Sequence, residues 1–178
     1  DMVSRGLGDV YKRQVLARLM TICNIDDTIT QINVGKRLMG LDVGKKTIGI
    51  AIGDPEHKIA SPHRILKRNK FSSDISGLFA EMDELNVAGL IIGWPLLMNG
   101  DVGPACDSVR DFTHALLKIK DLPVTFQDER LSTYAVERSM IKADLTRKKR
   151  QKRRDALAAS WILQTALDHY QQNNQTKK

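Results

Sequence analysis

Short runs of apolar and β-branched residues, separated by polar turns, recur along the chain from residue 37 onward. Runs of this kind predict strands. The first two flank the turn Gly44-Lys45-Lys46 and predict a hairpin, and the nearly apolar run VAGLIIG (87–93) is typical of a strand buried in a parallel sheet. The predicted strands are 37–42, 47–53, 61–67, 87–93 and 124–128.

Between the later strands, apolar residues recur every three or four positions, which predicts amphipathic helices. In the segment 74–85, for example, Ile75, Leu78 and Met82 share one helical face. Helices are predicted at 74–85, 104–118, 132–142 and 151–170, with a loop at 143–150. A hairpin followed by alternating helices and strands predicts a three-layer α/β fold with a mixed central sheet flanked by helices.

The two ends of the chain lack this periodicity. Residues 1–36 hold no sustained apolar pattern, and we expect them to form a non-native or disordered N-terminal extension. Residues 171–178 are polar, and we expect them to form a C-terminal tail. The segment between them, 37–170, has the size of one ordinary domain.

The composition excludes several classes of protein. Hydrophobic residues make up 42% and charged residues 28% of the chain, as in a globular domain. No apolar run is long enough to cross a membrane, and we expect no membrane partner. The two cysteines, Cys23 and Cys106, have no CxxC spacing, which argues against a zinc site or a disulfide scaffold and indicates a reducing compartment.

The net charge of +7 comes from one segment. Residues 147–154 read RKKRQKRR, with seven bases and no acid, so subtracting them leaves the rest of the chain formally neutral. Concentrated positive charge predicts a polyanionic partner, and we expect a nucleic acid whose phosphates contact basic side chains. The expected contact residues are Lys45, Lys46, Arg130, Arg147, Lys148, Lys149, Arg150, Lys152, Arg153 and Arg154.

Acidic residues stand where predicted strands end and where a predicted helix begins. Asp42 ends the first strand, and Asp128 and Glu129 end the last. Ligands of open α/β sheets gather at the carboxyl ends of strands, so these acids meet if the first and last strands lie side by side and parallel. Asp155 shares a helical stripe with the alanine and aliphatic residues that follow it. It therefore faces the core, where a carboxylate needs a partner or a cation.

Carboxylates that are brought together repel one another, and hard divalent cations relieve that repulsion. We expect Asp42, Asp128, Glu129 and Asp155 to converge closely enough to hold Mg²⁺ or Mn²⁺, as two ions. Such a site beside a phosphate-binding segment predicts a metal-dependent nuclease that hydrolyses phosphodiester bonds with metal-activated water. Taken singly, each acid has a simpler interpretation: Asp42 as a turn former, Glu129 in a surface ion pair with Arg130, and Asp155 as a helix N-terminal acid.

Four segments resemble the motifs of a known family, in the same order along the chain. They are GLDVGKKTIGIA (40–51), IIGWPLLMNG (91–100), DERLST (128–133) and RRDALAASWIL (153–163). They are similar to the motifs of the YqgF/RuvX family, which is related to the Holliday-junction resolvase RuvC and has an RNase H-like fold. The resemblance implies a bacterial cytoplasmic nuclease that trims the 5′ end of precursor 16S rRNA. It also implies that Asp42, Glu129 and Asp155 are the catalytic acids, and it places Thr47 where the family commonly has arginine. Asp128 is adjacent to Glu129, and whether it substitutes for Glu129 or assists it stays open.

Other functions stay open at this point. The same residues fit a resolvase of branched DNA, because basic side chains contact the phosphates that DNA and RNA share. A non-catalytic RNA-binding module would use the basic segment without the acids. An ATP-binding protein of the actin and Hsp70 type would need about twice this length for its two lobes. We expect a monomer or a weak homodimer, acting on precursor rRNA in the context of ribosomal particles.

Overall fold

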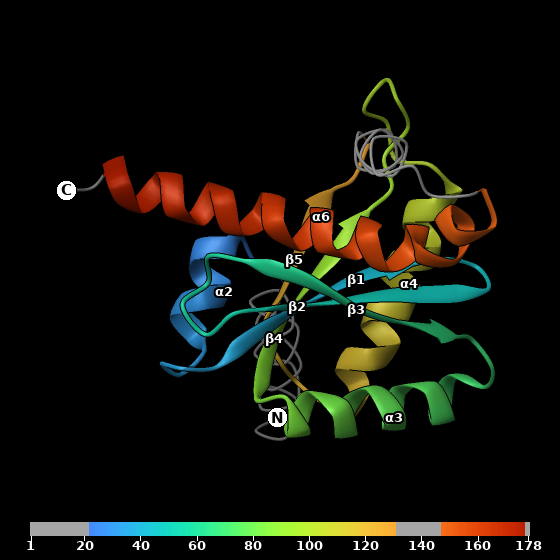
Figure 1. Ribbon diagram of the computed structural model, residues 1–178, viewed down its shortest axis with the longest axis horizontal. Coiled ribbons are helices and arrows are strands. Elements are labelled where there is room, and N and C mark those ends of the chain that lie inside the picture. Colours follow the sequence, from blue (N-terminus) through green and yellow to red (C-terminus); the bar gives the residue numbers. More distant parts are fainter. Residues whose placement is uncertain (1–21, 131–146, 177–178) are drawn as a thin grey trace, which may run out of the picture.

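A five-stranded mixed sheet forms the centre of the molecule in the computed structural model, which describes residues 22–130 and 147–176 (Figure 1). The strands are β1 (Arg37–Val43), β2 (Thr47–Gly53), β3 (Ala60–Lys67), β4 (Val87–Trp94) and β5 (Val124–Asp128). They are hydrogen-bonded in the order β3-β2-β1-β4-β5. The first three strands pair antiparallel, whereas β1, β4 and β5 run parallel to one another.

Helices cover both faces of this sheet (Figure 1). The helices α3 (Phe71–Glu84) and α4 (Pro104–Ile119) pack on one face, and α2 (Ile25–Gln31) and α6 (Arg147–Thr176) pack on the other. The prediction of a three-layer α/β fold with a mixed central sheet flanked by helices is therefore confirmed.

Side chains alternate between the two faces of each strand and so divide the interior into two cores. Met39 and Ile50 are fully buried on the face that packs against α3 and α4. Leu38, Ala51 and Ile91 are fully buried on the face that packs against α2 and α6. Full burial of one large aliphatic side chain contributes about 1.5–3 kcal/mol, so both cores hold the layers together.

Part of the segment 1–36, which was expected to be a non-native or disordered extension, is folded from residue 22 onward. There α2 begins after Asn24, whose Oδ1 accepts a hydrogen bond from the N–H of Asp27. The hydroxyl of Thr28 is buried and hydrogen-bonds the hydroxyl of Thr125 on β5 at 2.8 Å, which ties α2 to the sheet. With only seven residues, α2 is too short for a helical period to stand out in the sequence.

The last helix is longer than predicted at both ends. It spans 147–176, so the loop predicted at 143–150 is wrong for residues 147–150, and most of the predicted tail 171–178 is helical. Lysine, arginine and glutamine are strong helix formers, which lets α6 continue beyond the apolar stripe that anchors it. Residues 1–21 and the predicted helix 132–142 lie outside the described residues. Within the described parts of the chain, no helix combines the length and apolarity needed to cross a membrane.

Candidate active site

The strands β1 and β5 are parallel, but they are not neighbours, because β4 lies between them. The condition that the first and last strands lie side by side is therefore not met, although these strands are parallel. Asp42 near the end of β1 and Glu129 just beyond β5 are separated by β4 at Gly93. A Cβ atom on Gly93 would lie 2.1 Å from Oε2 of Glu129. The Glu129 carboxylate thus occupies the space that the absent side chain leaves above β4, and this brings it within electrostatic reach of Asp42.

Helix α6 carries Asp155 to the same part of the sheet. Asp42 pairs with Gly49 in the antiparallel register of β1 and β2. A Cβ atom on Gly49 would lie 1.9 Å from the backbone oxygen of Asp155, and one on Gly40 would lie 2.8 Å from the backbone oxygen of Ala159. Only residues without a side chain let a helix backbone lie this close to a sheet. These glycines therefore set Asp155 beside Asp42.

Two cavities open beside Asp42 and share the turn 44–45. The first has a volume of about 400 Å³ and also contains Asp155, and we call it the Asp155 cavity. The second has a volume of about 320 Å³ and is lined by Glu129 and the beginning of α4, and we call it the Glu129 cavity. Among the described residues, Asp42 is the acid that both cavities share, with one further acid in each.

Burial and mutual repulsion disfavour the charged forms of two of these acids. Burial, and then the charge of Asp155, raise the pKa of Asp42 to about 6, although Arg154 lowers it in part. Burial, followed by the charges of Asp42 and Asp128, raises the pKa of Glu129 to about 7. A cation in these cavities would oppose both shifts, because a nearby positive charge favours the carboxylate form. Raised pKa values of carboxyl groups that line cavities are typical of functional sites.

The predicted acids do not converge on one point. In the described residues, no group of three or more His, Cys, Asp or Glu side chains lies close enough together to hold one metal ion. The expectation that the four acids together hold Mg²⁺ or Mn²⁺ as two ions stays a prediction. Asp42 is coupled electrostatically to Asp155 in one cavity and to Glu129 in the other. The reason lies in the topology, since Asp155 and Glu129 reach Asp42 from different elements on its two sides.

Asp128 lies apart from the two cavities, against Arg130. The Arg130 Nη2 atom is 2.7 Å from Oδ2 of Asp128, and the Arg130 Nε–H donates to the same carboxylate. These hydrogen bonds hold the pKa of Asp128 below its ordinary value. Arg130 therefore forms its ion pair with Asp128, whereas the simpler interpretation from sequence paired it with Glu129. Of the two adjacent acids, the one that lines a cavity with Asp42 is Glu129.

Thr47 is a residue of the site that the sequence analysis did not predict. Its hydroxyl donates a hydrogen bond to Oδ2 of Asp155 at 2.6 Å, and it lines the Asp155 cavity together with Arg154. One sequence signal could have found it, because it stands two positions before Gly49 and so on the same face of β2. The interpretation of Asp155 as a helix N-terminal acid is wrong, since α6 begins at Arg147, about two turns earlier.

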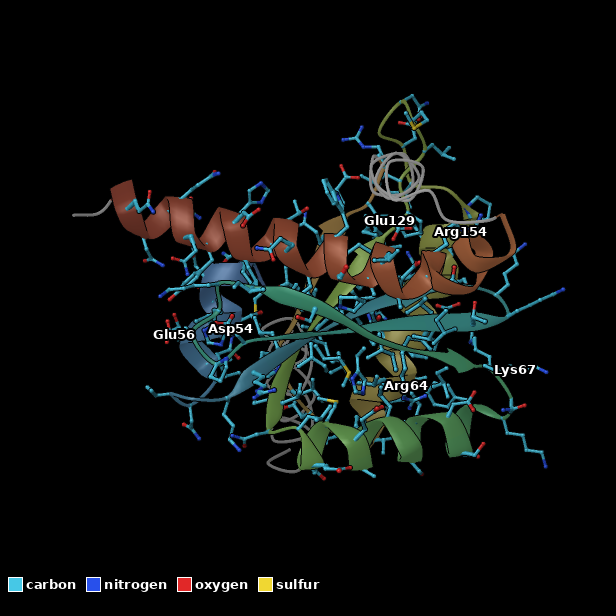
Figure 2. The ribbon with its side chains drawn as sticks, in the orientation of Figure 1. Asp54, Glu56, Arg64, Lys67, Glu129 and Arg154 are labelled. Atoms are coloured by element: carbon cyan, nitrogen blue, oxygen red, sulfur yellow. The ribbon has the colours of Figure 1, made fainter. Side chains whose placement is uncertain are left out.

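The basic residues predicted to contact nucleic acid gather around this end of the sheet. Lys45 and Lys46 are exposed in the β1–β2 turn, and Lys45 lines both cavities. Arg154 is exposed beside the Asp155 cavity, and the other six bases of the segment 147–154 belong to the first turns of α6. Figure 2 shows Arg154 and Glu129 beside the end of α6 where that helix begins. Positive charge thus borders the paired acids.

Several curated relatives align with most of this chain. A protein of Rhodobacter capsulatus is 48% identical over 110 residues, which cover 62% of this chain and 69% of the relative. One of Acidiphilium cryptum is 44% identical over 149 residues, which cover 84% of this chain and 94% of the relative. Both carry the name "Putative pre-16S rRNA nuclease".

Two solved structures show a more distant likeness, and a family model matches the chain directly. The complex of the fowlpox virus resolvase with Holliday junction DNA has a TM-score of 0.48 at 13% identity and covers 75% of this chain and 98% of that protein. RuvC of T. thermophilus with a Holliday junction substrate has a TM-score of 0.46 at 12% identity and covers 76% of this chain and 96% of that protein.

The family model described as "RuvX: Holliday junction resolvase" matches residues 36–169. This chain therefore belongs to the RuvX family.

Proposed function

We propose that this protein is a metal-dependent nuclease that hydrolyses phosphodiester bonds, with Asp42, Glu129 and Asp155 as its catalytic acids. The observation that carries the proposal is the place of Asp42 between two cavities, each of which adds one further acid. The raised pKa values of Asp42 and Glu129 support it, because their causes, burial and the repulsion of neighbouring carboxylates, are both opposed by a bound cation. Membership of the RuvX family agrees with this chemistry.

The acids suit a hard divalent cation such as Mg²⁺ or Mn²⁺, since all of their donor atoms are carboxylate oxygens. Asp42 and Asp155 would hold one ion, and Asp42 and Glu129 would hold a second. Asp128 would act at longer range, through its charge on Glu129. Divalent ions in such pairs activate water and stabilise the leaving oxygen of a phosphodiester.

The basic side chains would bind and orient the nucleic acid. Lys45 lines both cavities and would meet the phosphate nearest the acids. Arg154, Lys46 and Arg130 would contact neighbouring phosphates, and the bases of 147–153 would contact the backbone farther away. Because each neutralised phosphate releases counterions, the affinity should fall steeply as salt rises.

Precursor 16S rRNA is the substrate that we propose, because the relatives carry that name. The reaction would trim its 5′ end in the bacterial cytoplasm, on ribosomal particles. Branched DNA is the second candidate, because the matching family model is described by Holliday junction resolution.

The test compares these two substrates directly. Purified protein is incubated with precursor 16S rRNA that carries its 5′ extension and with a four-way DNA junction, each with Mg²⁺ and with EDTA. We expect Mg²⁺-dependent shortening of the RNA that stops at a defined end. If the protein cleaves only the DNA junction, branched DNA takes the place of precursor rRNA as the proposed substrate. If it binds the RNA or the junction but cleaves neither, it is a non-catalytic binding module.

The matched control for this test is Asp42→Asn, which keeps the shape of the side chain and removes its charge. We expect it to reduce cleavage on the order of 10³-fold, as the loss of a central electrostatic group does, and to leave RNA binding at low salt within about threefold. A folded Asp42→Asn protein that cuts as fast as the wild type would refute the assignment of the site.

A further inference from the structure

The hydrogen bond between Thr47 and Asp155 joins β2 to α6 inside the Asp155 cavity. The Oγ1–Oδ2 distance of 2.6 Å is short and typical of a hydroxyl that donates to a charged carboxylate. Thr47 is half-buried, and three quarters of the Asp155 side chain is shielded from solvent. The hydrogen bond is therefore shielded from competing water more than a surface contact would be.

Strand β2 holds Asp155 at two points. The absent side chain of Gly49 lets the backbone of Asp155 lie against the strand, and the Thr47 hydroxyl binds the carboxylate. Residues 47 and 49 lie on the same face of the strand, because side chains alternate with a period of two. The contact at Gly49 fixes the position of the Asp155 backbone. The hydrogen bond from Thr47 restricts the torsions of the Asp155 side chain.

The group that orients Asp155 is uncharged. A hydroxyl fixes the carboxylate without neutralising it, so both negative charges of Asp42 and Asp155 stay available to a cation. The neighbouring cation Arg154 acts more weakly on Asp155, since its Nε lies 3.8 Å from Oδ1 and its side chain is about half exposed.

We propose that Thr47 is a positioning residue, whose hydroxyl orients the Asp155 carboxylate for binding a hard divalent cation together with Asp42. This inference rests on the proposed function and adds a residue to it. In this role Thr47 acts through Asp155, to which its hydroxyl donates.

The experiment measures Mn²⁺ binding by the full chain, from the electron paramagnetic resonance signal of free Mn²⁺. We expect Thr47→Val, which keeps the branched shape and removes the hydroxyl, to weaken binding about tenfold to a hundredfold, the range for one hydrogen bond to a charged group. Thr47→Ser restores the hydroxyl and should bind within about threefold of the wild type. In cleavage assays, Thr47→Val should raise the Mg²⁺ concentration for half-maximal rate and change the rate at saturating Mg²⁺ less.

Thr165→Val is the matched control. The Thr165 hydroxyl donates to the backbone oxygen of Trp161 on the exposed side of α6, away from the site. This variant should keep the Mn²⁺ affinity of the wild type. Thermal unfolding in EDTA checks that all variants are folded, and Thr47→Ala takes the place of Thr47→Val if the valine variant is unfolded.

The outcomes separate this inference from the function on which it rests. Equal Mn²⁺ affinity of Thr47→Val and the wild type, with weakened binding by Asp42→Asn, would overturn the role of Thr47 alone. Equal losses in Thr47→Val and Thr47→Ser would also overturn it, because the hydroxyl would then make no difference. A wild-type protein that binds no Mn²⁺ would overturn both the inference and the proposed metal-dependent activity.

Discussion

The two faces of the central sheet are built from different side chains, although they belong to the same strands. The face toward α3 and α4 carries large, fully buried aliphatic residues, which are Met39, Leu41, Ile48, Ile50, Leu90 and Ile92. On the face toward α6, the same strands carry small residues near the site, which are Gly40, Gly49, Ala51 and Gly93.

The difference in side-chain size between the two faces explains why the acidic site lies where it does. Large side chains keep a helix layer about 10 Å from a sheet and fill the space between them. Where the side chains are absent, the backbone of α6 touches the sheet and Glu129 reaches across β4. The Asp155 cavity consequently lies between the sheet and α6, and the Glu129 carboxylate fills the space above Gly93 on the same face.

The largest expected effect comes from a methyl group at Gly49. Its Cβ atom would lie 1.9 Å from the backbone oxygen of Asp155, and a helix backbone cannot move aside without separating from the sheet. We expect Gly49→Ala to lower the free energy of unfolding by about 3 kcal/mol, measured by urea denaturation.

Gly53→Ala is the control on the same strand and the same face. Its Cβ atom would meet its neighbours at 3.4 Å or more, which is ordinary contact. It should change the free energy of unfolding by less than about 1 kcal/mol. Similar losses in both variants would show that the close approach of α6 is not specific to Gly49.

The next effect is a pH dependence of stability that comes from Asp42 and Glu129. In the folded protein the pKa is about 6 for Asp42 and about 7 for Glu129, against ordinary values of 3.8 and 4.5. The folded state then retains protons that the unfolded chain has lost, so in EDTA the free energy of unfolding should fall as pH rises from about 4 to about 7.

Asp42→Asn isolates the share of Asp42 in this pH dependence. One pKa unit corresponds to about 1.4 kcal/mol, so the variant should be about 3 kcal/mol more stable than the wild type at pH 8 and nearly equal to it at pH 4. Urea denaturation in EDTA at the two pH values gives the comparison. A difference that is the same at both values would contradict the raised pKa of Asp42.

A smaller loss of stability is expected at Gly93, together with a clear loss of activity. Here a Cβ atom would meet Oε2 of Glu129 at 2.1 Å and Cδ1 of Ile162 at 2.7 Å, which are the ends of flexible side chains. Gly93→Ala should therefore lower the free energy of unfolding by about 1 kcal/mol. It should also displace the Glu129 carboxylate and reduce cleavage at least about tenfold, the lower range for losing one preorganised group. Full activity in this variant would show that the position of the Glu129 carboxylate does not matter for cleavage.

The smallest effect is expected at Asp128, which lies outside the two cavities. Its exposed ion pair with Arg130 contributes little, so Asp128→Asn should change the free energy of unfolding by less than about 1 kcal/mol. Cleavage should stay within about threefold of the wild type, whereas Glu129→Gln should lose most of it. Equal losses in the two variants would make Asp128 a ligand alongside Glu129.

Local patterns were sufficient for most of the fold. The strands and the helices α3 and α4 follow from the periods of their apolar residues, because such a period depends only on positions close together in the chain. The dependence on local periodicity also explains why two helical segments were not predicted. The helix α2 is too short to show a period, and the first turns of α6 are polar but helical because the rest of that helix anchors them.

The residues that line the candidate site could be predicted from the sequence, but its geometry only in part. The motifs singled out Asp42, Glu129 and Asp155, and the structure places all three at two adjoining cavities. The strand order, and with it the separation of the acids into two pairs, could not be predicted, because many strand orders fit the same alternation of elements. Asp128 and Glu129 are adjacent in sequence, and only the contact with Arg130 distinguishes their positions.

The sequence by itself determined most of the elements that this protein forms, a candidate set of carboxylates, and a basic segment suited to phosphates. Only the tertiary structure decided that β4 separates the acids, that Gly49 and Gly93 make room for them, and that a neutral hydroxyl from Thr47 orients Asp155. The physical reason is that a period or a motif reports on neighbours in the chain. The distance between a strand and a helix a hundred residues later depends instead on how their side chains, or the lack of them, pack together.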